Sequence, residues 1–506
     1  MMFPKNDELN IIFLPFVSHG HLIPLVDVAT LFAKLGAIVT IATTDANAAL
    51  FHSKIHRDSV SGSRIRLHTI PWPAEKVGLS PTIQNLSTTT SMAMPKVLEA
   101  FLMLQPQLED LIHEMRPDCI VADIFYPWTT KVAAELGIPR LAFNGSSFFG
   151  YCAEECIKEH KPHLEVQSNS DKFKLPGLPD VIEMTKSQLP SWITTQDGFS
   201  RFLDGIKESE RQCYGIIMNS FYELESSYEE HMNKVLGMKT WSIGPVSLLA
   251  NKEVEDKECR GGNPSIQTTN LLQWLNEKEP NSVLYISFGS LVQMNPNQIS
   301  EIAHAIRESA QNFIWVIKRN DDDDDIEKAK LIDEGLPKGF EEDMIKSKKG
   351  LIIRGWAPQL MILEHESIGG FLTHCGWNSI LEGVSSGLPM ITWPLFAEQF
   401  YNEKLLVEVV KIGVGVGSKK WWFVGEEKQE IVKREDIGKA MAFLMGGNVK
   451  ALEIRKRAKE MGEAARRAVN CGGFSHINLL SLFKELQQLK LTRDQSSLGT
   501  LNHFTI

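Results

Sequence analysis

Short apolar runs alternate with helix-length segments along the chain, and this alternation limits the folds that it can adopt. The first apolar run, residues 10–16, ends in a loop at residues 17–21, and a helical pattern follows over residues 22–35. Further apolar runs lie at residues 37–42, 64–70, 118–123 and 140–143. Strands that alternate with helices predict a parallel sheet with helices on both faces.

A second set of alternating runs begins after the polar residues 251–263, which have the composition of an interdomain linker. The apolar runs of this set lie at residues 282–288, 313–317, 351–353, 370–373 and 390–393. A length of 506 residues also favours two large domains or three small ones over a single domain. We therefore predict an α/β protein with two doubly wound, Rossmann-like domains that face each other across a cleft.

The predicted domain boundaries follow these runs. The N-terminal α/β domain takes residues 1–245, the linker residues 246–267, and the C-terminal α/β domain residues 268–470. A helical pattern continues beyond them, and we expect residues 471–490 to form a helix that packs back on the N-terminal domain. Residues 491–506 have the polar composition of a chain end and are expected to form a tail.

The composition excludes several classes of protein. The formal net charge is −10, so no basic excess is available to neutralise the backbone of a nucleic acid. The cysteines are scattered without a C-x-x-C pair, which speaks against a disulfide framework or a zinc ribbon and favours a reducing compartment. The N-terminus lacks the pattern of a signal peptide, and no stretch reads as a membrane span. We expect a cytoplasmic protein that acts as a monomer.

Two common nucleotide-binding motifs are missing from the sequence. Neither G-x-G-x-x-G after the first predicted strand nor G-x-x-x-x-G-K-[ST] occurs, and the glycines of residues 413–417 have the pattern of a strand. Dinucleotide oxidoreduction and P-loop hydrolysis therefore lose their main support. Ligands of open α/β sheets bind at the carboxyl ends of the strands, so we expect a site shared between the two domains.

The strongest functional signal lies in residues 356–399. This segment opens with Trp-Ala-Pro-Gln, continues with His-Cys-Gly-Trp-Asn-Ser at residues 374–379 and ends with Glu398 and Gln399. The other segments that carry the signal are Gly-His-Leu-Ile-Pro at residues 20–24, Asp123, Phe-Tyr-Glu-Leu-Glu at residues 221–225 and Ser-Phe-Gly-Ser at residues 287–290.

Together these segments resemble the plant family-1 UDP-dependent glycosyltransferases over nearly the whole chain. Residues 175–179 and 241–247 resemble the subgroup that acts on triterpenoid saponins and flavonoids. The resemblance implies the glycosyltransferase-B fold and inverting transfer of a sugar from a UDP-sugar to a hydroxyl group of a small lipophilic metabolite. The expected acceptor is a triterpenoid, and a flavonoid or other phenol is the alternative. The resemblance implies no cofactor besides the UDP-sugar co-substrate and no metal ion.

The turn at residues 374–379 has the chemistry of a diphosphate site. The helix that follows this turn presents free N–H groups and the positive end of its dipole. His374, Asn378 and Ser379 can each donate a hydrogen bond to a phosphate oxygen. Ser290, in a glycine turn after another predicted strand, is expected to donate from the opposite side.

The resemblance assigns the uridine to Trp356, Ala357 and Gln359 and the ribose to Glu382. An indole offers a flat face on which a base can stack, and the backbone of Ala357 can read the edge of the uracil. Glu382 lies one helical turn beyond Asn378 on the same face, so its carboxylate can accept both ribose hydroxyl groups.

The resemblance assigns the sugar of the donor to Trp377, Glu398 and Gln399. Gln399 resembles the users of UDP-glucose, since users of UDP-galactose tend to carry histidine there. Trp377 departs from the arginine of some glucuronosyl-transferring relatives. The expected donor is therefore UDP-glucose.

Transfer also needs a base that removes the proton of the acceptor, and a histidine with a pKa near neutrality suits this role. His21 is the candidate base, at the turn from the first strand to the first helix, and Asp123 is its expected orienting carboxylate. His19 is the rival base. Attack from the face opposite the UDP turns an α-linked donor into a β-glycoside without a glycosyl-enzyme intermediate.

Two alternatives stay open. Residues 321–325 are consecutive aspartates that contain the Asp-x-Asp metal-binding pattern of a different glycosyltransferase architecture, although a run of acids between basic residues is more typical of a solvated loop. A protein of another class, which binds a nucleotide sugar without turnover, would keep the same donor site.

Overall fold

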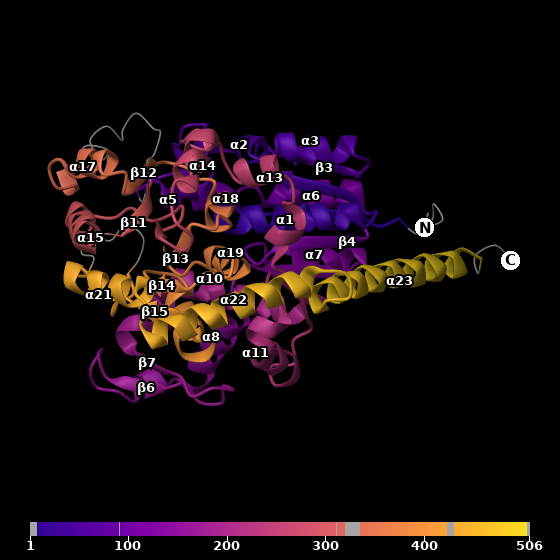
Figure 1. Ribbon diagram of the computed structural model, residues 1–506. Coiled ribbons are helices and arrows are strands. Elements are labelled where there is room, and N and C mark those ends of the chain that lie inside the picture. The colour runs from indigo at the N-terminus through magenta and orange to yellow at the C-terminus, as the bar shows by residue number, and fades with distance from the viewer. Residues whose placement is uncertain (1–7, 91, 310, 319–333, 423–429, 503–506) are drawn as a thin grey trace.

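The computed structural model describes residues 8–90, 92–309, 311–318, 334–422 and 430–502. It confirms the predicted fold, since two parallel sheets covered by helices form two Rossmann-like domains. Figure 1 shows the N-terminal domain in indigo and purple beside the C-terminal domain in orange.

The sheet of the N-terminal domain is parallel throughout. Its strands run in the spatial order β3 (Ile65–Thr69), β2 (Ile38–Thr43), β1 (Asn10–Leu14), β4 (Cys119–Asp123), β5 (Arg140–Asn144), β8 (Gly215–Met218) and β9 (Thr240–Ser242). The chain reverses its direction of winding between β1 and β4, whose register pairs Leu14 with Ala122. The apolar residues of β1 are fully buried because helices cover both faces of the sheet.

The helices of this domain connect the strands. They are α1 (His19–Lys34), α2 (Asp45–Ala49), α3 (His52–Val60), α4 (Ala74–Val77), α5 (Met94–Leu102), α6 (Gln105–Met115), α7 (Thr129–Leu136), α8 (Phe148–His160), α9 (Ser191–Thr194), α10 (Gly198–Gln212) and α11 (Tyr222–Lys234). The turn-rich region after α8 also contains an antiparallel hairpin of β6 (Lys172–Lys174) and β7 (Glu183–Thr185).

The sheet of the C-terminal domain repeats the same winding. Its parallel strands run in the order β12 (Gly350–Arg354), β11 (Asn312–Ile317), β10 (Val283–Ser287), β13 (Ile368–Thr373), β14 (Met390–Thr392) and β15 (Gly413–Gly415). The winding reverses between β10 and β13, where Ser287 pairs with Thr373. Each sheet thus has a topological switch point, the place where open α/β sheets bind ligands.

The remaining helices cover the second sheet and join the domains. The linker region contains α12 (Val246–Ala250) and α13 (Val254–Glu258), and the later helices are α14 (Thr268–Asn276), α15 (Pro296–Ser309), α17 (Phe340–Lys346), α18 (Gln359–Leu363), α19 (Trp377–Ser385), α20 (Gln399–Lys404), α21 (Arg434–Met445), α22 (Val449–Val469) and α23 (Phe474–Asn502).

The last helix, α23, belongs to the core of the N-terminal domain. It packs against β9, the hydroxyl of Ser475 donates to the carbonyl of Gly244 (2.6 Å), and the side chain of Leu482 is fully buried among N-domain residues. Lys490 forms an ion pair with Asp118 at the start of β4 (2.7 Å). The helix continues to Asn502, whereas the sequence analysis expected a tail from residue 491. Yellow α22 and α23 therefore run along both domains in Figure 1.

Candidate active site

A cavity of about 630 Å³ lies between the two domains, at the carboxyl ends of the strands. It is lined by almost every site residue that the sequence predicted: His21, Ser290, Trp356, Ala357, Gln359, His374, Trp377, Asn378, Ser379, Glu382, Glu398 and Gln399. The exception is Asp123, which is fully buried behind His21. The fold thus gathers residues from both switch points around one space.

His21 and Asp123 form a hydrogen-bonded pair across the switch point of the first sheet. His21 lies in the first turn of α1 and Asp123 ends β4, and the imidazole Nδ1 lies 2.9 Å from the carboxylate Oδ2. The second oxygen of Asp123 accepts the backbone N–H of Phe125 (3.1 Å). The carboxylate is therefore held on both sides and can orient the imidazole.

The surroundings of His21 raise its pKa above the ordinary 6.5. Burial alone would lower this pKa, but the charge and hydrogen bond of Asp123, together with the charge of Glu398, outweigh it. The rings of Phe16 and Phe125 stand edge-on to the imidazole, each with a centroid separation of 5.5 Å. His21 is thus a fixed base that is stronger than a free histidine.

His19, the rival base, has a different environment. It is 5 % exposed, and its backbone N–H donates to the hydroxyl of Ser87 (3.1 Å). Burial and the nearby charge of Lys318 lower its pKa to about 4, against a smaller raising effect from Gly261. Its ring lies 5.0 Å from that of Trp356. With so low a pKa and no carboxylate partner in the described chain, His19 is a weak base, and the geometry favours His21.

His374 lies at the switch point of the second sheet, directly after β13. Its ring is enclosed by two glycines, because a methyl group added to Gly289 or Gly376 would lie 2.5 Å from ring atoms. Burial lowers its pKa to about 4, so at neutral pH the ring is uncharged and can offer an N–H donor rather than a positive charge.

The other predicted phosphate donors form hydrogen bonds with the N-terminal domain or with another residue of the C-terminal domain. The amide of Asn378 donates to the carbonyl of Gly20 (2.6 Å), and the hydroxyl of Ser290 lies 3.2 Å from that of Ser87. Ser379 accepts a hydrogen bond from Gln359 (3.2 Å). No side chain caps the N-terminus of α19, so its first N–H groups remain available to an anion.

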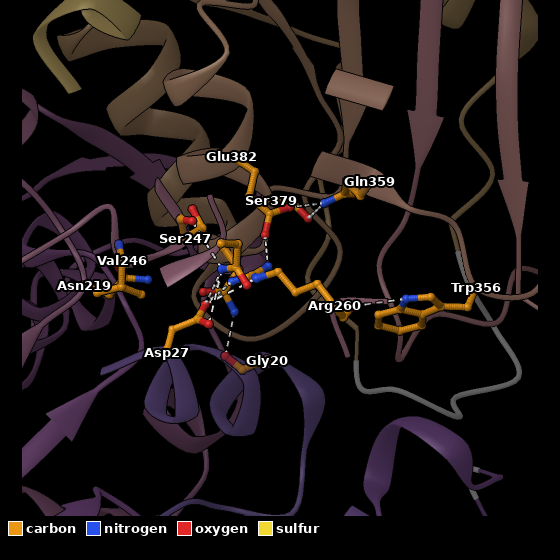
Figure 2. Close-up of polar contacts among 12 residues, drawn as sticks. Gly20, Asp27, Asn219, Val246, Ser247, Arg260, Trp356, Gln359, Ser379 and Glu382 are labelled. Carbon is orange, nitrogen blue, oxygen red and sulfur yellow. Dashed lines mark hydrogen bonds and ion pairs between the residues drawn. The ribbon is translucent and has the colours of Figure 1, made fainter. Parts of the chain in front are cut away.

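The predicted nucleoside residues form one connected group. The amide of Gln359 donates to Glu382 Oε2 (2.6 Å), and Glu382 is 4 % exposed. The indole N–H of Trp356 donates to the carbonyl of Arg260 (3.2 Å). The other oxygen of Glu382 accepts from the guanidinium of Arg260, as Figure 2 shows.

The predicted sugar residues also line the cavity. Gln399 Oε1 accepts the backbone N–H groups of Leu395 (3.0 Å) and Phe396 (3.1 Å), which leaves the amide N–H₂ as the donor. Burial raises the pKa of Glu398, partly offset by its own backbone N–H and by His21. The indole N–H of Trp377 donates to the carbonyl of Asn219 (2.8 Å), so this edge of the ring ties the two domains together.

Sequence reasoning missed Arg260 and Asp27 at this site. Arg260 lies in the segment assigned to the linker, and its guanidinium pairs with Asp27 of α1 as well as with Glu382. Arg260 belongs to no motif or periodic pattern, and Asp27 is a polar residue within the helical pattern at residues 22–35. The one local signal was the pair of glycines, Gly261 and Gly262, that follows Arg260, since adjacent glycines often mark a close approach of the backbone.

The described part of the chain assembles no group of three or more His, Cys, Asp or Glu side chains that could hold a metal ion. The aspartate run at residues 321–325 lies outside the described residues. None of the described helices combines the length and the apolar character that crossing a bilayer requires.

Comparison with known proteins gives matches over the full length. The family model described as UDP-glucoronosyl and UDP-glucosyl transferase matches residues 82–418. The chain is 46 % identical to soyasapogenol B glucuronide galactosyltransferase of Glycine max, covering 97 % of this chain and 98 % of that protein. It is also 46 % identical to UDP-glucose flavonoid 3-O-glucosyltransferase 7 of Fragaria ananassa, covering 95 % and 97 %.

A solved structure has nearly the same fold. The crystal structure of Glycyrrhiza uralensis UGT73P12 complexed with glycyrrhetinic acid 3-O-monoglucuronide is similar with a TM-score of 0.92 and 45 % identity, over 98 % of this chain and 99 % of that one.

Proposed function

The chain belongs to the UDP-glucoronosyl and UDP-glucosyl transferase family, and from this premise we propose that it transfers glucose from UDP-glucose to a hydroxyl group of a triterpenoid. Its class, a UDP-glycosyltransferase of the glycosyltransferase-B fold, follows from the family. The observation that carries the proposed mechanism is the His21–Asp123 pair (2.9 Å), in which His21 lines the same cavity as the residues suited to uridine diphosphate.

The proposed reaction is a single displacement with inversion. Asp123 holds Nδ1 of His21, so Nε2 accepts the proton of the acceptor hydroxyl while the oxygen attacks the anomeric carbon. The bond from that carbon to the diphosphate breaks, and UDP leaves with the bonding electrons. The neutral ring of His374 and the N-terminus of α19 are suited to stabilise the charge on the leaving group. An α-linked donor would thus yield a β-glycoside.

The choice of glucose is supported by Gln399. Its Oε1 is held by two backbone N–H groups, so the free N–H₂ group of the amide is available to a sugar hydroxyl. A relative that is 46 % identical is a UDP-glucose user by its description, whereas another at the same identity is a galactosyltransferase. UDP-galactose is therefore the donor to test against UDP-glucose.

The proposed acceptor class is supported by relatives and by the wall beside the base. Two relatives above 40 % identity are described with triterpenoid glucuronides, and one with a flavonoid. The rings of Phe16 and Phe125 flank His21, and Phe202 stacks on Phe125 with centroids 6.3 Å apart. Such an apolar wall suits a lipophilic acceptor, and a flavonoid is the alternative.

The test is an assay of product by mass spectrometry. Wild-type protein is incubated with UDP-glucose, UDP-galactose or UDP-glucuronate and with triterpenoid or flavonoid aglycones, and UDP binding is measured by calorimetry. We expect a hexoside from UDP-glucose. His21→Ala should lower turnover by about 10²- to 10⁴-fold while UDP still binds, because only the base is lost. UDP binding without any product would instead identify a silent binding protein.

We also propose that transfer needs no metal ion. The expected outcome is full activity in excess chelator, because neutral N–H and hydroxyl donors and a helix N-terminus surround the proposed diphosphate position. If chelator abolished the activity and added metal restored it, the transfer would need a metal ion, and the aspartates at residues 321–325 would again be candidate ligands. The monomeric state remains a prediction, which sedimentation can test. The cytoplasmic location also remains a prediction, which cell fractionation can test.

A further inference from the structure

Arg260 joins a carboxylate of each domain inside the donor site. Its Nη2 and Nε lie 2.9 and 3.3 Å from Oδ2 of Asp27 on α1, and its Nη1 contacts Oε1 of Glu382 on α19. The side chains of all three residues are at most 11 % exposed. In Figure 2 the guanidinium stands between the two acids, and Trp356 lies at the other end of Arg260, beside its main chain. One linker residue thus connects the N-terminal domain to the residue that we assign to the ribose.

Arg260 and Gln359 together fix the plane of the Glu382 carboxylate. Arg260 contacts Oε1, and the amide of Gln359 donates to Oε2 (2.6 Å). A carboxylate has about four acceptor positions, so two contacts leave room for two hydroxyl groups. A carboxylate that is held on both oxygens is oriented before a ligand arrives, which lowers the entropic cost of binding.

The main chain around Arg260 fits the same site. Its carbonyl accepts the indole N–H of Trp356, and the hydroxyl of Ser265 accepts the backbone N–H of Trp356 (2.9 Å). The backbone of Gly262 approaches the indole so closely that an added methyl group would lie 3.0 Å from it. The linker therefore packs against the two residues that we assign to the base and to the ribose.

Arg260 also compensates charge. Without it, two buried carboxylates, Asp27 and Glu382, would lose the guanidinium that pairs with both of them. Burial alone would lower the pKa of Arg260, but the two carboxylates outweigh it and raise the pKa, so the guanidinium keeps its charge. Truncation of one partner of a buried pair leaves the other charge uncompensated, which is strongly unfavourable.

We propose that Arg260 is a positioning residue for the donor: it orients Glu382 toward the ribose hydroxyl groups and anchors that carboxylate to the N-terminal domain through Asp27. This inference rests on the proposed function. Arg260 acts through Glu382, so its contribution depends on the ribose hydroxyl groups of the ligand. It stabilises the bound donor in the ground state and the transition state alike, and therefore acts on KM more than on kcat.

The test compares UDP with 2′-deoxy-UDP, which lacks one of the hydroxyl groups assigned to Glu382. Calorimetry gives Kd for both nucleotides with wild type, Arg260→Ala and Arg260→Lys. We expect Arg260→Ala to weaken UDP binding about tenfold or more, because a hydrogen bond to a charged group is lost. The weakening of 2′-deoxy-UDP should be much smaller, so the preference for UDP shrinks. Arg260→Lys keeps the positive charge but lacks the planar guanidinium that can bond two partners. Its UDP affinity should lie between those of wild type and Arg260→Ala.

A matched control is Arg57→Ala. Arg57 on α3 pairs with Asp256 of the linker, so its loss removes one of the ties between the linker and the N-terminal domain, but Arg57 does not line the cavity. This variant should bind both nucleotides as wild type does. In turnover, Arg260→Ala should raise KM for the UDP-sugar and change kcat by less than about threefold.

The outcomes separate this inference from the proposed function. Wild type that fails to bind UDP would overturn the function, and this inference with it. Wild type that binds UDP, with Arg260→Ala unchanged, or with UDP and 2′-deoxy-UDP weakened equally, would overturn the positioning role alone. Tighter UDP binding by Arg260→Ala would also overturn it, since the linker would then be competing with the nucleotide.

Discussion

His19 and His21 stand two residues apart in the first turn of α1, yet their surroundings give them opposite acid–base properties. The pKa of His19 falls to about 4 because it is buried and lies near the charge of Lys318. The pKa of His21 rises because Asp123 and Glu398 outweigh its burial. The sequence named both histidines as candidates. The sequence alone could not show which of them has a carboxylate partner, because Asp123 is 102 positions away from His21.

The His21–Asp123 pair predicts a shift in the pH profile. The base must be neutral, so the rate should fall as the pH drops through the pKa of His21, which lies above 6.5. In Asp123→Asn the raising effect of the carboxylate is gone and burial remains, which lowers the pKa. The acidic limb of kcat/KM should therefore move to lower pH, while kcat falls about 10²-fold or more.

The measurement is a pH series of kcat/KM for wild type and Asp123→Asn. A matched control is Asp118→Asn, a buried aspartate just before the same strand that pairs with Lys490 instead of a histidine. This control should keep the position of the acidic limb. An unmoved limb in Asp123→Asn would remove Asp123 from the mechanism.

At the scale of elements, apolar runs predicted the strands well and the irregular regions poorly. The predicted run at residues 370–373 lies within β13, and the helix expected after residues 374–376 is α19. A strand buried on both faces needs a continuous apolar run, which the sequence displays. The hairpin of β6 and β7 has strands of three residues each, too short to give a pattern. Such elements depend on tertiary packing.

The turn between β10 and α15 predicts a role for Gly289. This glycine has a φ of +73°, and a methyl group there would lie 2.5 Å from the ring of His374. Gly289→Ala should therefore displace His374 and weaken UDP binding about tenfold or more, the equivalent of one charge-assisted hydrogen bond. Calorimetry with UDP measures this effect.

Gly137→Ala separates displacement of His374 from backbone strain. Gly137 ends α7 with a φ of +65°, and no atom lies within 4 Å of the position of an added methyl group. Both variants carry the cost of alanine in the left-handed region, about 1 kcal/mol of stability. Gly137→Ala should bind UDP like wild type. Equal UDP affinity in the two variants would contradict the proposed contact of His374 with the diphosphate.

At the scale of the whole molecule, the two domains are tied by contacts that have no local sequence pattern. Ser147 donates to Asn402 (2.7 Å), Trp377 to Asn219, and Asn378 to Gly20. Partners so far apart are found only once the fold has placed them. The sequence thus predicted two domains and a cleft, but neither the closure of the cleft nor the place of Arg260 within it.

The path of α23 makes the stability of the N-terminal domain depend on the end of the chain. Leu482 is fully buried in the N-domain core, next to Phe483, whose ring lies 6.1 Å from that of Phe32 on α1. Leu482→Ala removes buried methyl groups and leaves a cavity, which costs about 2–5 kcal/mol. We expect the midpoint of thermal unfolding to fall by several degrees, with UDP affinity unchanged at low temperature.

A control on the same helix distinguishes packing from helix propensity. Ile477 lies on α23 and is 51 % exposed, so Ile477→Ala should leave the midpoint within about one degree of wild type. Both changes place alanine in α23, but of these two residues only Leu482 reaches the core of the N-terminal domain. If Leu482→Ala unfolds at the same temperature as Ile477→Ala, α23 does not stabilise the N-terminal domain in solution. If only Leu482→Ala lowers the midpoint, residues more than 200 positions beyond β9 complete the domain that carries the proposed base.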